Sequence, residues 1–186
     1  MGTRAITIID NTLREGEQTP GVAFTCEEKL LLIGRLVEAG VKAFDAAFPE
    51  SAPEEREVLA AARQAHPGAL VGASCRLIPG TVEAALALDP GLLFVIVPVS
   101  DVHLARCLGV TRQEMLGRMA VSLGPAKGFP GLCVVLEDAF RAEEGFLLRC
   151  VEEAARLVAT RVFLADTVGV MIPDLLTWLH EGPHHH

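Results

Sequence analysis

Short apolar runs alternate with longer amphipathic segments along most of this chain. Six of the apolar runs have the length and composition of buried β-strands, and each is followed by a segment with helical periodicity. The predicted strands span residues 5–9, 41–46, 69–74, 92–97, 131–136 and 161–165. Apolar strands that alternate with helices form parallel sheets joined by right-handed crossovers. The pattern therefore predicts an α/β domain with about six strand–helix units.

The predicted helices carry recognisable start and stop signals. A capping box, in which Ser or Thr precedes Glu by three positions, opens a helix by satisfying free backbone N–H groups. Three such pairs are Thr25 with Glu28, Ser51 with Glu54, and Thr111 with Glu114. Gly40 suits the end of the first of these helices, on which Leu30 and Ile33 share one face. Pro173 is placed to begin a last helix.

Two arrangements of the sheet fit this order of elements. One is an open, flavodoxin-like sheet, and the other is a closed barrel. An open nucleotide-binding sheet is expected to carry a glycine-rich phosphate loop after its first strand, and Gly16 and Gly21 do not form a GxGxxG sequence. The pattern of elements by itself leaves both arrangements open.

Composition narrows the class of protein. Of the 186 residues 51% are hydrophobic, but the longest apolar run, 92–99, is too short to cross a bilayer. The first residues lack the apolar core of a secretory signal, and five scattered cysteines without a CxxC pair favour a reducing compartment. A net charge of −8 with dispersed cations disfavours nucleic-acid binding. The expected setting is the cytoplasm, with neither membrane nor nucleic acid as a partner.

The polar run after the first predicted strand, DNTLREGEQ at 10–18, is the most informative stretch for chemistry. In barrel enzymes the loops after the strands converge over the barrel mouth, so Arg14 and Glu15 are expected to face a pocket. A carboxylate there can bind a divalent cation, and a guanidinium can stabilise a developing oxyanion. The simpler alternative is a structural ion pair at the end of a strand.

Five further motifs follow this run in a regular order. The six motifs are DNTLREGEQTPGVAF at 10–24, FPESAPEEREV at 48–58, SCRL at 74–77, VPVSDVH at 97–103, LEDAFRAE at 136–143 and FLADTVGVMIP at 163–173. In this order and spacing the chain resembles the DRE-TIM metallolyases, and most closely the homocitrate synthases of the nitrogen-fixation type. The resemblance extends to about Trp178. It implies an incomplete TIM (β/α)8-type barrel instead of an open sheet.

The resemblance also implies that part of the barrel is missing from this chain. A TIM barrel has eight units and about 250 residues, so residues 1–181 would form a partial catalytic domain that lacks strands seven and eight. In the family the seventh strand carries a His-x-His pair that completes the metal site. His184 and His186 have that spacing, but no strand-forming run precedes them, so residues 182–186 are expected to be a tail or tag remnant. The open edges predict a homo-oligomer or pairing with a complementary barrel fragment.

The resemblance assigns roles to seven residues, position by position. Arg14 would be the catalytic arginine that binds the carbonyl of the 2-oxo acid, and Glu15 the acid that binds the metal. The substrate-binding positions are Arg14, Gln18, Asp45, Arg76, Glu137 and Thr167. Simpler alternatives are an ion pair between Arg14 and Glu15, local backbone hydrogen bonds for Gln18, and a rim salt bridge for Arg76.

Some other positions have less specific assignments. Asp138 is expected to cap the following helix, and His103 to be an ordinary residue of a helical first turn. Cys133 and Val135 stand where some homocitrate synthases carry polar substrate contacts, which leaves the identity of the acyl acceptor open. Asp45, an acid among apolar residues, must find a partner or shift its pKa.

The reaction that the resemblance implies is a metal-assisted Claisen condensation of acetyl-CoA with 2-oxoglutarate to give homocitrate. The cofactor would be a divalent metal, namely Mg, Mn, Zn or Fe. Because the family's general acid and base come partly from segments absent here, the chain alone is expected to be inactive. The alternatives are an isopropylmalate or citramalate synthase-like enzyme, and a non-catalytic fragment or subunit that assembles with a complementary chain.

Overall fold

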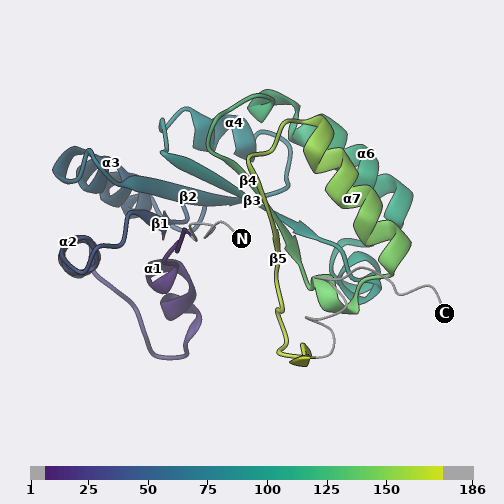
Figure 1. The fold of residues 1–186 in the computed structure, drawn as a ribbon, viewed down its shortest axis with the longest axis horizontal. Helices are drawn as coiled ribbons and strands as arrows, with labels where there is room; N and C mark the ends of the chain where they lie inside the picture. Colours follow the sequence, from purple (N-terminus) through teal and green to yellow (C-terminus); the bar gives the residue numbers. More distant parts are fainter. Residues whose placement is uncertain (1–6, 174–186) are drawn as a thin grey trace, which may run out of the picture.

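Five parallel strands form one sheet in the computed structural model, which describes residues 7–173 (Figure 1). The strands are β1 (Ala43–Ala47), β2 (Leu70–Arg76), β3 (Leu92–Pro98), β4 (Leu132–Glu137) and β5 (Arg161–Leu164). They match the predicted second to sixth strands to within two residues at each end. The apolar runs of the sequence therefore located these strands correctly.

The order of the strands decides between the open sheet and the barrel. Neighbouring strands are hydrogen-bonded in sequence order from β1 to β5, whereas the strand order of a flavodoxin-like sheet reverses near its first strand. A sequential parallel order is that of a TIM barrel. The described residues form a partial barrel, as the resemblance implied, with five strands where about six were expected.

The predicted first strand is described only in part. Residues 5 and 6 lie outside the described residues, and residues 7–9 form no ladder. Asp10 alone makes a parallel bridge to Phe44, in which its N–H donates to the carbonyl of Ala43 and its carbonyl accepts from the N–H of Asp45. The prediction of a strand over 7–9 is wrong, because this segment meets β1 only at its last residue and leaves Ile8 72% exposed.

Helices alternate with the strands. They are α1 (Thr12–Glu15), α2 (Cys26–Glu38), α3 (Glu54–Ala65), α4 (Thr81–Leu86), α5 (Asp101–His103), α6 (Arg112–Ser122) and α7 (Glu144–Arg156). A π-helical turn, Leu104–Leu108, continues α5. The helix predicted after Pro173 lies outside the described residues.

Two of the three predicted capping boxes are confirmed. They are the pair Thr25 with Glu28, which opens α2, and the pair Thr111 with Glu114, which opens α6. The prediction for Ser51 is wrong, because α3 begins at Glu54 directly after Pro53 without a side-chain cap. The Ser51 hydroxyl instead donates to the carbonyl of Phe48 at 2.7 Å, which closes a local turn.

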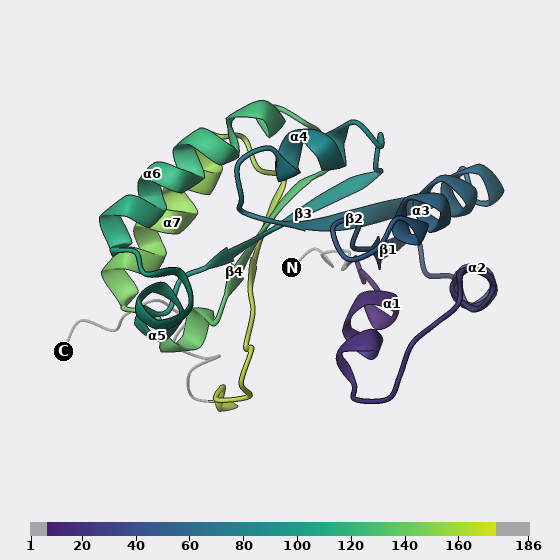
Figure 2. The same ribbon diagram turned by 180° about the vertical axis from the view of Figure 1, so that it is seen from behind.

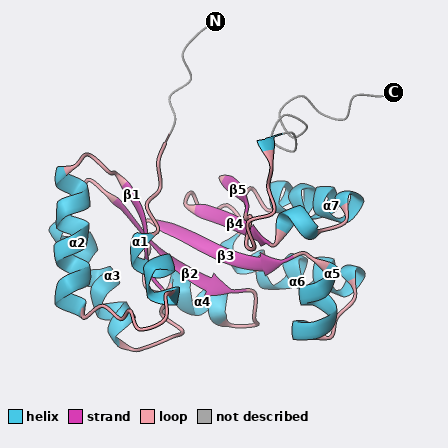
Figure 3. Ribbon diagram, turned by 90° about the horizontal axis from the view of Figure 1, so that it is seen from below, coloured by secondary structure: helices cyan, strands magenta, loops and turns pink. Residues whose placement is uncertain are grey.

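The helices cover one side of the curved sheet. α3 packs against β1 and β2, α4 packs against β2 and β3, and α6 lies beside α7. Figures 1 and 2 show α4 above the sheet and α1 below it, with the segment after β5 extending downward on the same side as α1. Figure 3 shows the strands between the α2–α3 pair and the α6–α7 pair. No helix of residues 7–173 is both long and apolar enough to cross a membrane.

Alternate residues of β3 point to the two faces of the sheet. Leu93 and Val95 pack in the cluster that includes residues of α6 and α7, whereas Leu92 and Phe94 belong to a separate cluster. In that second cluster the rings of Phe94 and Phe163 lie 6.0 Å apart. Gly72 on β2 leaves room for them, because a Cβ at this position would lie 2.6 Å from the Phe94 ring. The barrel side of the sheet is thus filled by side chains, as in TIM barrels.

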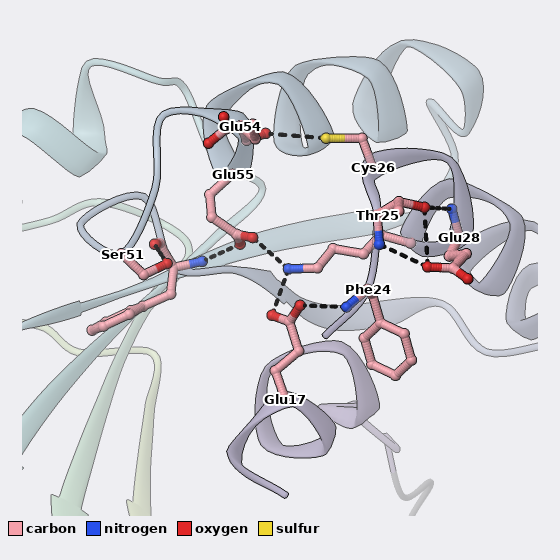
Figure 4. A network of polar contacts seen from close by, with 10 residues as sticks. Glu17, Phe24, Thr25, Cys26, Glu28, Ser51, Glu54 and Glu55 are labelled. Atoms are coloured by element: carbon pink, nitrogen blue, oxygen red, sulfur yellow. Dashed lines mark hydrogen bonds and ion pairs between the residues drawn. The ribbon is translucent and has the colours of Figure 1, made fainter. Parts of the chain in front are cut away.

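A buried ammonium group on α2 ties the loop of residues 16–24 to the helical layer. The Lys29 side chain is 2% exposed and forms ion pairs with Glu17, at 2.7 Å, and with Glu55 on α3. The second oxygen of Glu17 accepts from the N–H of Phe24, and that of Glu55 accepts from the N–H of Phe48. Figure 4 shows the carboxylates of Glu17 and Glu55 turned toward each other. This cluster, the Lys29 network, joins four separate segments of the chain.

The Lys29 network stabilises the charged form of the Lys29 side chain. Burial opposes the ammonium group, but the ion pairs with Glu17 and Glu55 outweigh burial and raise the pKa of Lys29. A lysine whose pKa rises on folding contributes stability that is fully present below its unfolded pKa of about 10.4. That contribution is lost as the pH rises through the higher folded value. Lys29 is therefore charged at neutral pH and holds the loop against α3.

Replacing Lys29 by Met should lower the free energy of unfolding by about 3 to 5 kcal/mol, because two carboxylates lose their buried partner. Urea denaturation at neutral pH measures this change. Arg35→Met is the matched control on the same helix, since Arg35 and Glu38 are both exposed and such a pair contributes about 0.5 kcal/mol or less. The difference in the free energy of unfolding between Lys29→Met and the wild type should become smaller above about pH 10.4. Equal losses in the two variants would contradict this account.

Candidate functional site

The loops at the carboxyl ends of the strands enclose two adjoining cavities. The large cavity has a volume of about 480 Å³ and the small cavity about 270 Å³. The predicted site residues that line one or both are Arg14, Glu15, Gln18, Arg76, Glu137 and Thr167. Arg14, Gln18 and Glu137 line both cavities, so the two adjoin at these side chains. The seventh predicted residue, Asp45, lies behind Arg14.

Arg14 lies at the centre of this arrangement. Its Nε donates to Oδ2 of Asp45 at 2.5 Å, and its Nη2 lies 2.5 Å from Oε1 of Glu15. The side chain is 15% exposed, and that exposed part faces the cavities. The simple ion pair with Glu15 is therefore present, and it stands at a cavity wall. Among residues 7–173 the third guanidinium nitrogen, Nη1, takes part in neither a hydrogen bond nor an ion pair.

Asp45 is the buried anchor for Arg14. It is 3% exposed on β1, and the Ser74 hydroxyl lies 2.8 Å from both of its carboxylate oxygens. Burial raises the pKa of Asp45, and the neighbouring Arg14 and Ser74 offset part of that rise. The pairing of β1 with β2 shifts register between Asp45 and Ala47, an irregularity that is common beside active sites. The sequence predicted that this buried acid needs a partner or a shifted pKa, and Arg14 and Ser74 are its partners.

Glu15 supplies hard oxygen atoms to the small cavity, and its side chain is 45% exposed. Within residues 7–173 no three His, Cys, Asp or Glu side chains gather to hold a metal ion. Mg²⁺ and similar ions are bound in many proteins by one or two carboxylates together with water and substrate. The part of the chain that the structure describes therefore fits one ligand of a divalent cation and does not form a complete metal centre.

Arg76 approaches the large cavity from the end of β2. Its backbone N–H and its Nε donate to the two carboxylate oxygens of Glu50, at 2.8 and 2.9 Å. Its guanidinium carbon lies 6.0 Å from the centre of the Phe48 ring. The rim salt bridge is therefore present, but the side chain is 59% exposed and its two terminal nitrogens remain open to an anion.

Three further predicted residues differ in how firmly they are held. Thr167 follows β5, and its hydroxyl accepts from the N–H of Asp138 at 2.8 Å. The side chains of Gln18 and Glu137 form no hydrogen bond to any other described residue. The local backbone bond considered for Gln18 is thus not found among these residues. Both side chains face the cavities with their hydrogen-bonding capacity unused.

One minor expectation is overturned at this edge of the sheet. Asp138 does not cap the next helix, because its φ of +61° turns the chain sharply and its carboxylate binds Arg141 at both oxygens. This hydrogen bonding lowers the pKa of Asp138. Glu143 caps α7 in its place, by accepting from two N–H groups of the first turn. Sequence reasoning missed that an acid five residues further along could do this.

His103 is in the short helix α5, as the sequence predicted, and Val135 lines the small cavity. Cys133 is instead fully buried and is absent from the lining of both cavities, so it does not stand at a substrate-contact position. The sequence did not single out Ser74, the partner of Asp45, or Glu55, which lines the large cavity beside the Lys29 network. Strand alternation could have found Ser74, since it shares a face of β2 with Arg76.

The fold and the cavity at the carboxyl ends of its strands define a barrel of the TIM class, with polar side chains where TIM-barrel enzymes carry their active sites. The family model described as HMGL-like matches residues 5–180. The chain belongs to the HMGL-like family.

Curated relatives of this chain carry different enzyme names. The chain is 41% identical over 172 residues to homocitrate synthase AksA of Methanopyrus kandleri, which covers 90% of this chain and 43% of the relative. It is 36% identical over 178 residues to a probable 2-isopropylmalate synthase of Ignicoccus hospitalis, covering 95% and 44%. The chain therefore spans less than half the length of these relatives.

A solved structure supports the fold. Hydroxymethylglutaryl-CoA lyase from Pseudomonas aeruginosa superposes with a TM-score of 0.79 over 95% of this chain and 62% of its own, at 20% sequence identity. At this level of identity the likeness shows the fold alone. It confirms that five sequential parallel strands and their helices are a portion of a TIM-type barrel.

The cysteines should differ sharply in reactivity, because only the thiolate reacts. Burial raises the pKa of Cys75 to about 12, of Cys133 to about 11 and of Cys150 to about 12. Cys107 is exposed. Iodoacetamide at mildly alkaline pH should therefore modify Cys107 first and leave the three buried thiols intact, as read by peptide mass spectrometry. A denatured sample, in which all five should react, is the control, and fast modification of native Cys75 or Cys133 would contradict the burial of these strands.

Proposed function

We propose that this chain is a portion of the catalytic barrel of an acyltransferase that condenses acetyl-CoA with a 2-oxo acid. The preferred 2-oxo acid is 2-oxoglutarate, which would make the activity that of a homocitrate synthase. Membership of the HMGL-like family and the relative named homocitrate synthase support this proposal. A divalent metal, for which Glu15 would supply one ligand, would polarise the ketone.

The observation that carries the proposal is the placement of two guanidinium groups on one cavity. Arg14 lines both cavities, and Arg76 stands at the rim of the large cavity with a side chain that is 59% exposed. 2-Oxoglutarate carries a 2-oxo acid group at one end and a second carboxylate at the other. A ligand of this kind suits two cations at different points of one hollow, because guanidinium groups bind carboxylates through paired N–H donors.

The proposed chemistry assigns distinct tasks to the described residues. The methyl group of acetyl-CoA loses a proton, its carbon forms a bond to the ketone carbon, and the ketone oxygen becomes an alkoxide that takes up a proton. Water then cleaves the thioester and releases CoA. Arg14 would oppose the negative charge on the ketone oxygen, a task for which a preorganised donor contributes about 2.7 to 4 kcal/mol. Thr167 and Gln18 would hold the carboxylate of the 2-oxo acid.

A 2-oxo acid with an apolar side chain is the second candidate. The remaining wall of the large cavity is apolar, and it is formed by Leu77, Ile78, Ile96, Pro98, Leu108 and Met115. Val135 in the small cavity likewise offers no polar contact. Such a wall favours the substrates of isopropylmalate or citramalate synthases, and a relative at 36% identity carries the first of these names.

Assembly with a complementary chain is part of the proposal. Among the described residues β5 is paired only on its β4 side, and Asp10 alone bridges the other edge of the sheet. Open edges of a parallel sheet are normally paired or covered. Further strands from a second copy or from a complementary barrel fragment would pair these edges and bring the remaining metal ligands. The alternative is that the chain has a non-catalytic role in such an assembly. Measurement of CoA release distinguishes the two.

Binding of 2-oxo acids tests the assignment of Arg14. In calorimetric titrations with Mg²⁺ or Mn²⁺, the chain should bind 2-oxoglutarate more tightly than pyruvate or 2-oxoisovalerate. Arg14→Gln should weaken that binding by about ten-fold or more, since a charge-assisted hydrogen bond is lost. Arg35→Gln on the outer helix should leave it unchanged, and circular dichroism should show that both variants are folded. Tighter binding of 2-oxoisovalerate would favour the second candidate, and unchanged binding by Arg14→Gln would contradict the proposed site.

Release of CoA tests whether the barrel must be completed. The purified chain with acetyl-CoA, the preferred 2-oxo acid and Mg²⁺ or Mn²⁺ should release no free CoA. Addition of a fragment from a homocitrate synthase that carries the remaining strands and their His-x-His pair should produce turnover. Turnover by the chain alone would overturn the requirement for completion. A lack of turnover in both mixtures would favour the non-catalytic alternative.

A further inference from the structure

The Nδ1 atom of His103 is buried without a hydrogen-bond partner, and it is the one such side-chain nitrogen or oxygen among residues 7–173. It lies 3.9 Å from Oε2 of Glu137 and 4.0 Å from Oδ2 of Asp138. Buried polar atoms are almost always hydrogen-bonded, and those that are not commonly have a functional cause. The position of this nitrogen beside two carboxylates indicates what that cause is.

The two carboxylates are not equivalent partners for His103. Asp138 is fully engaged, because Nε and Nη2 of Arg141 donate to its two oxygens at 2.7 and 2.5 Å. Glu137 accepts no side-chain hydrogen bond from any described residue, and it lines both cavities. The unused donor capacity of His103 and the unused acceptor capacity of Glu137 therefore face each other.

The backbone around His103 brings this side chain to the end of β4. Ser100 caps α5 by accepting from the N–H of His103 at 3.3 Å. The π-helical turn Leu104–Leu108 follows immediately and ends at Gly109, whose φ is +62°. π-Helical turns occur frequently at functional sites, and this one places Leu108 in the wall of the large cavity. The same short segment thus contributes to the cavity and reaches Glu137.

We propose that His103 is a positioning residue for Glu137. Because Nδ1 faces the Glu137 carboxylate, whose acceptor capacity is unused, it carries the proton, so that an N–H and not a lone pair points toward that carboxylate. A movement of the Glu137 side chain by about 1 Å brings the pair within ordinary hydrogen-bond distance. The hydrogen bond holds the Glu137 carboxylate toward the cavities. The consequence for substrate rests on the proposed function and on the substrate-binding role that the resemblance implies for Glu137, whereas the pair itself rests on neither.

The tautomer of His103 tests the pair without any assay of activity. Long-range ¹H–¹⁵N spectra of the labelled chain at alkaline pH, with the His103 signals assigned from His103→Asn, distinguish Nδ1–H from Nε2–H imidazole. We expect the Nδ1–H form in the wild type and in Asp101→Asn, a control that removes a carboxylate from the same short helix. We expect the Nε2–H form in Glu137→Ala. An Nε2–H wild type, or a Glu137→Ala variant that keeps the wild-type tautomer, would overturn the proposal.

The effect on ligand binding separates this proposal from the proposed function. His103→Leu should weaken 2-oxo acid binding by about ten-fold, while His103→Asn, whose amide can donate from the position of Nδ1, should retain most of it. Equal losses in both variants would show that His103 acts only through packing and would overturn its positioning role. If the wild type binds no 2-oxo acid but shows the Nδ1–H form, the proposed function fails and the pair stands. If the wild type binds the 2-oxo acid but shows the Nε2–H form, the pair fails and the proposed function stands.

Discussion

The ion pair between Arg14 and Asp45 is the constraint on which the site depends. A buried carboxylate such as that of Asp45 on β1 is costly unless a cation and hydrogen bonds compensate it, and Arg14 and Ser74 supply both. This ion pair therefore fixes the Arg14 side chain over the end of β1. This places α1, and with it Glu15 and Gln18, against the cavities. The same contact that stabilises the barrel end thus presents a guanidinium to a ligand.

A second buried cation secures the same loop from the other side. Lys29 ties Glu17, three residues beyond Arg14, to Glu55 on α3, and these carboxylates also bind backbone N–H groups of the two loops. Arg14 and Glu17, in the middle of the segment 10–24, are therefore each held by an ion pair to a buried side chain. Rigid support of this kind is what a binding site needs, because ligand groups must be met within fractions of an ångström. The likeness to longer relatives fits a site that is built in part by this chain.

Sequence patterns predicted the features that local chemistry controls. The apolar runs located β1 to β5, and the capping pairs at Thr25 and Thr111 located two helix starts. The motif at 10–18 placed Arg14 and Glu15 at a cavity although the strand predicted before it is reduced to a bridge at Asp10, since the loops at strand ends converge in barrels. Lys29 could not be foreseen, because its partners lie 12 and 26 residues away and a lysine beside Leu30 is expected in solvent. Ser51 failed as a cap because Pro53 opens α3 after a turn that the pattern does not reveal.

The central claim is that Arg14 and Glu15 share a hollow that receives a divalent cation and a 2-oxo acid. Paramagnetic broadening by Mn²⁺ in the presence of 2-oxoglutarate tests it most directly, because broadening falls steeply with distance from the ion. The account predicts that the amide signals of Glu15, Gln18 and Thr167 broaden first, and that Glu15→Gln abolishes this effect. Broadening confined to the acidic start of α3, or an unchanged pattern in Glu15→Gln, would contradict the account.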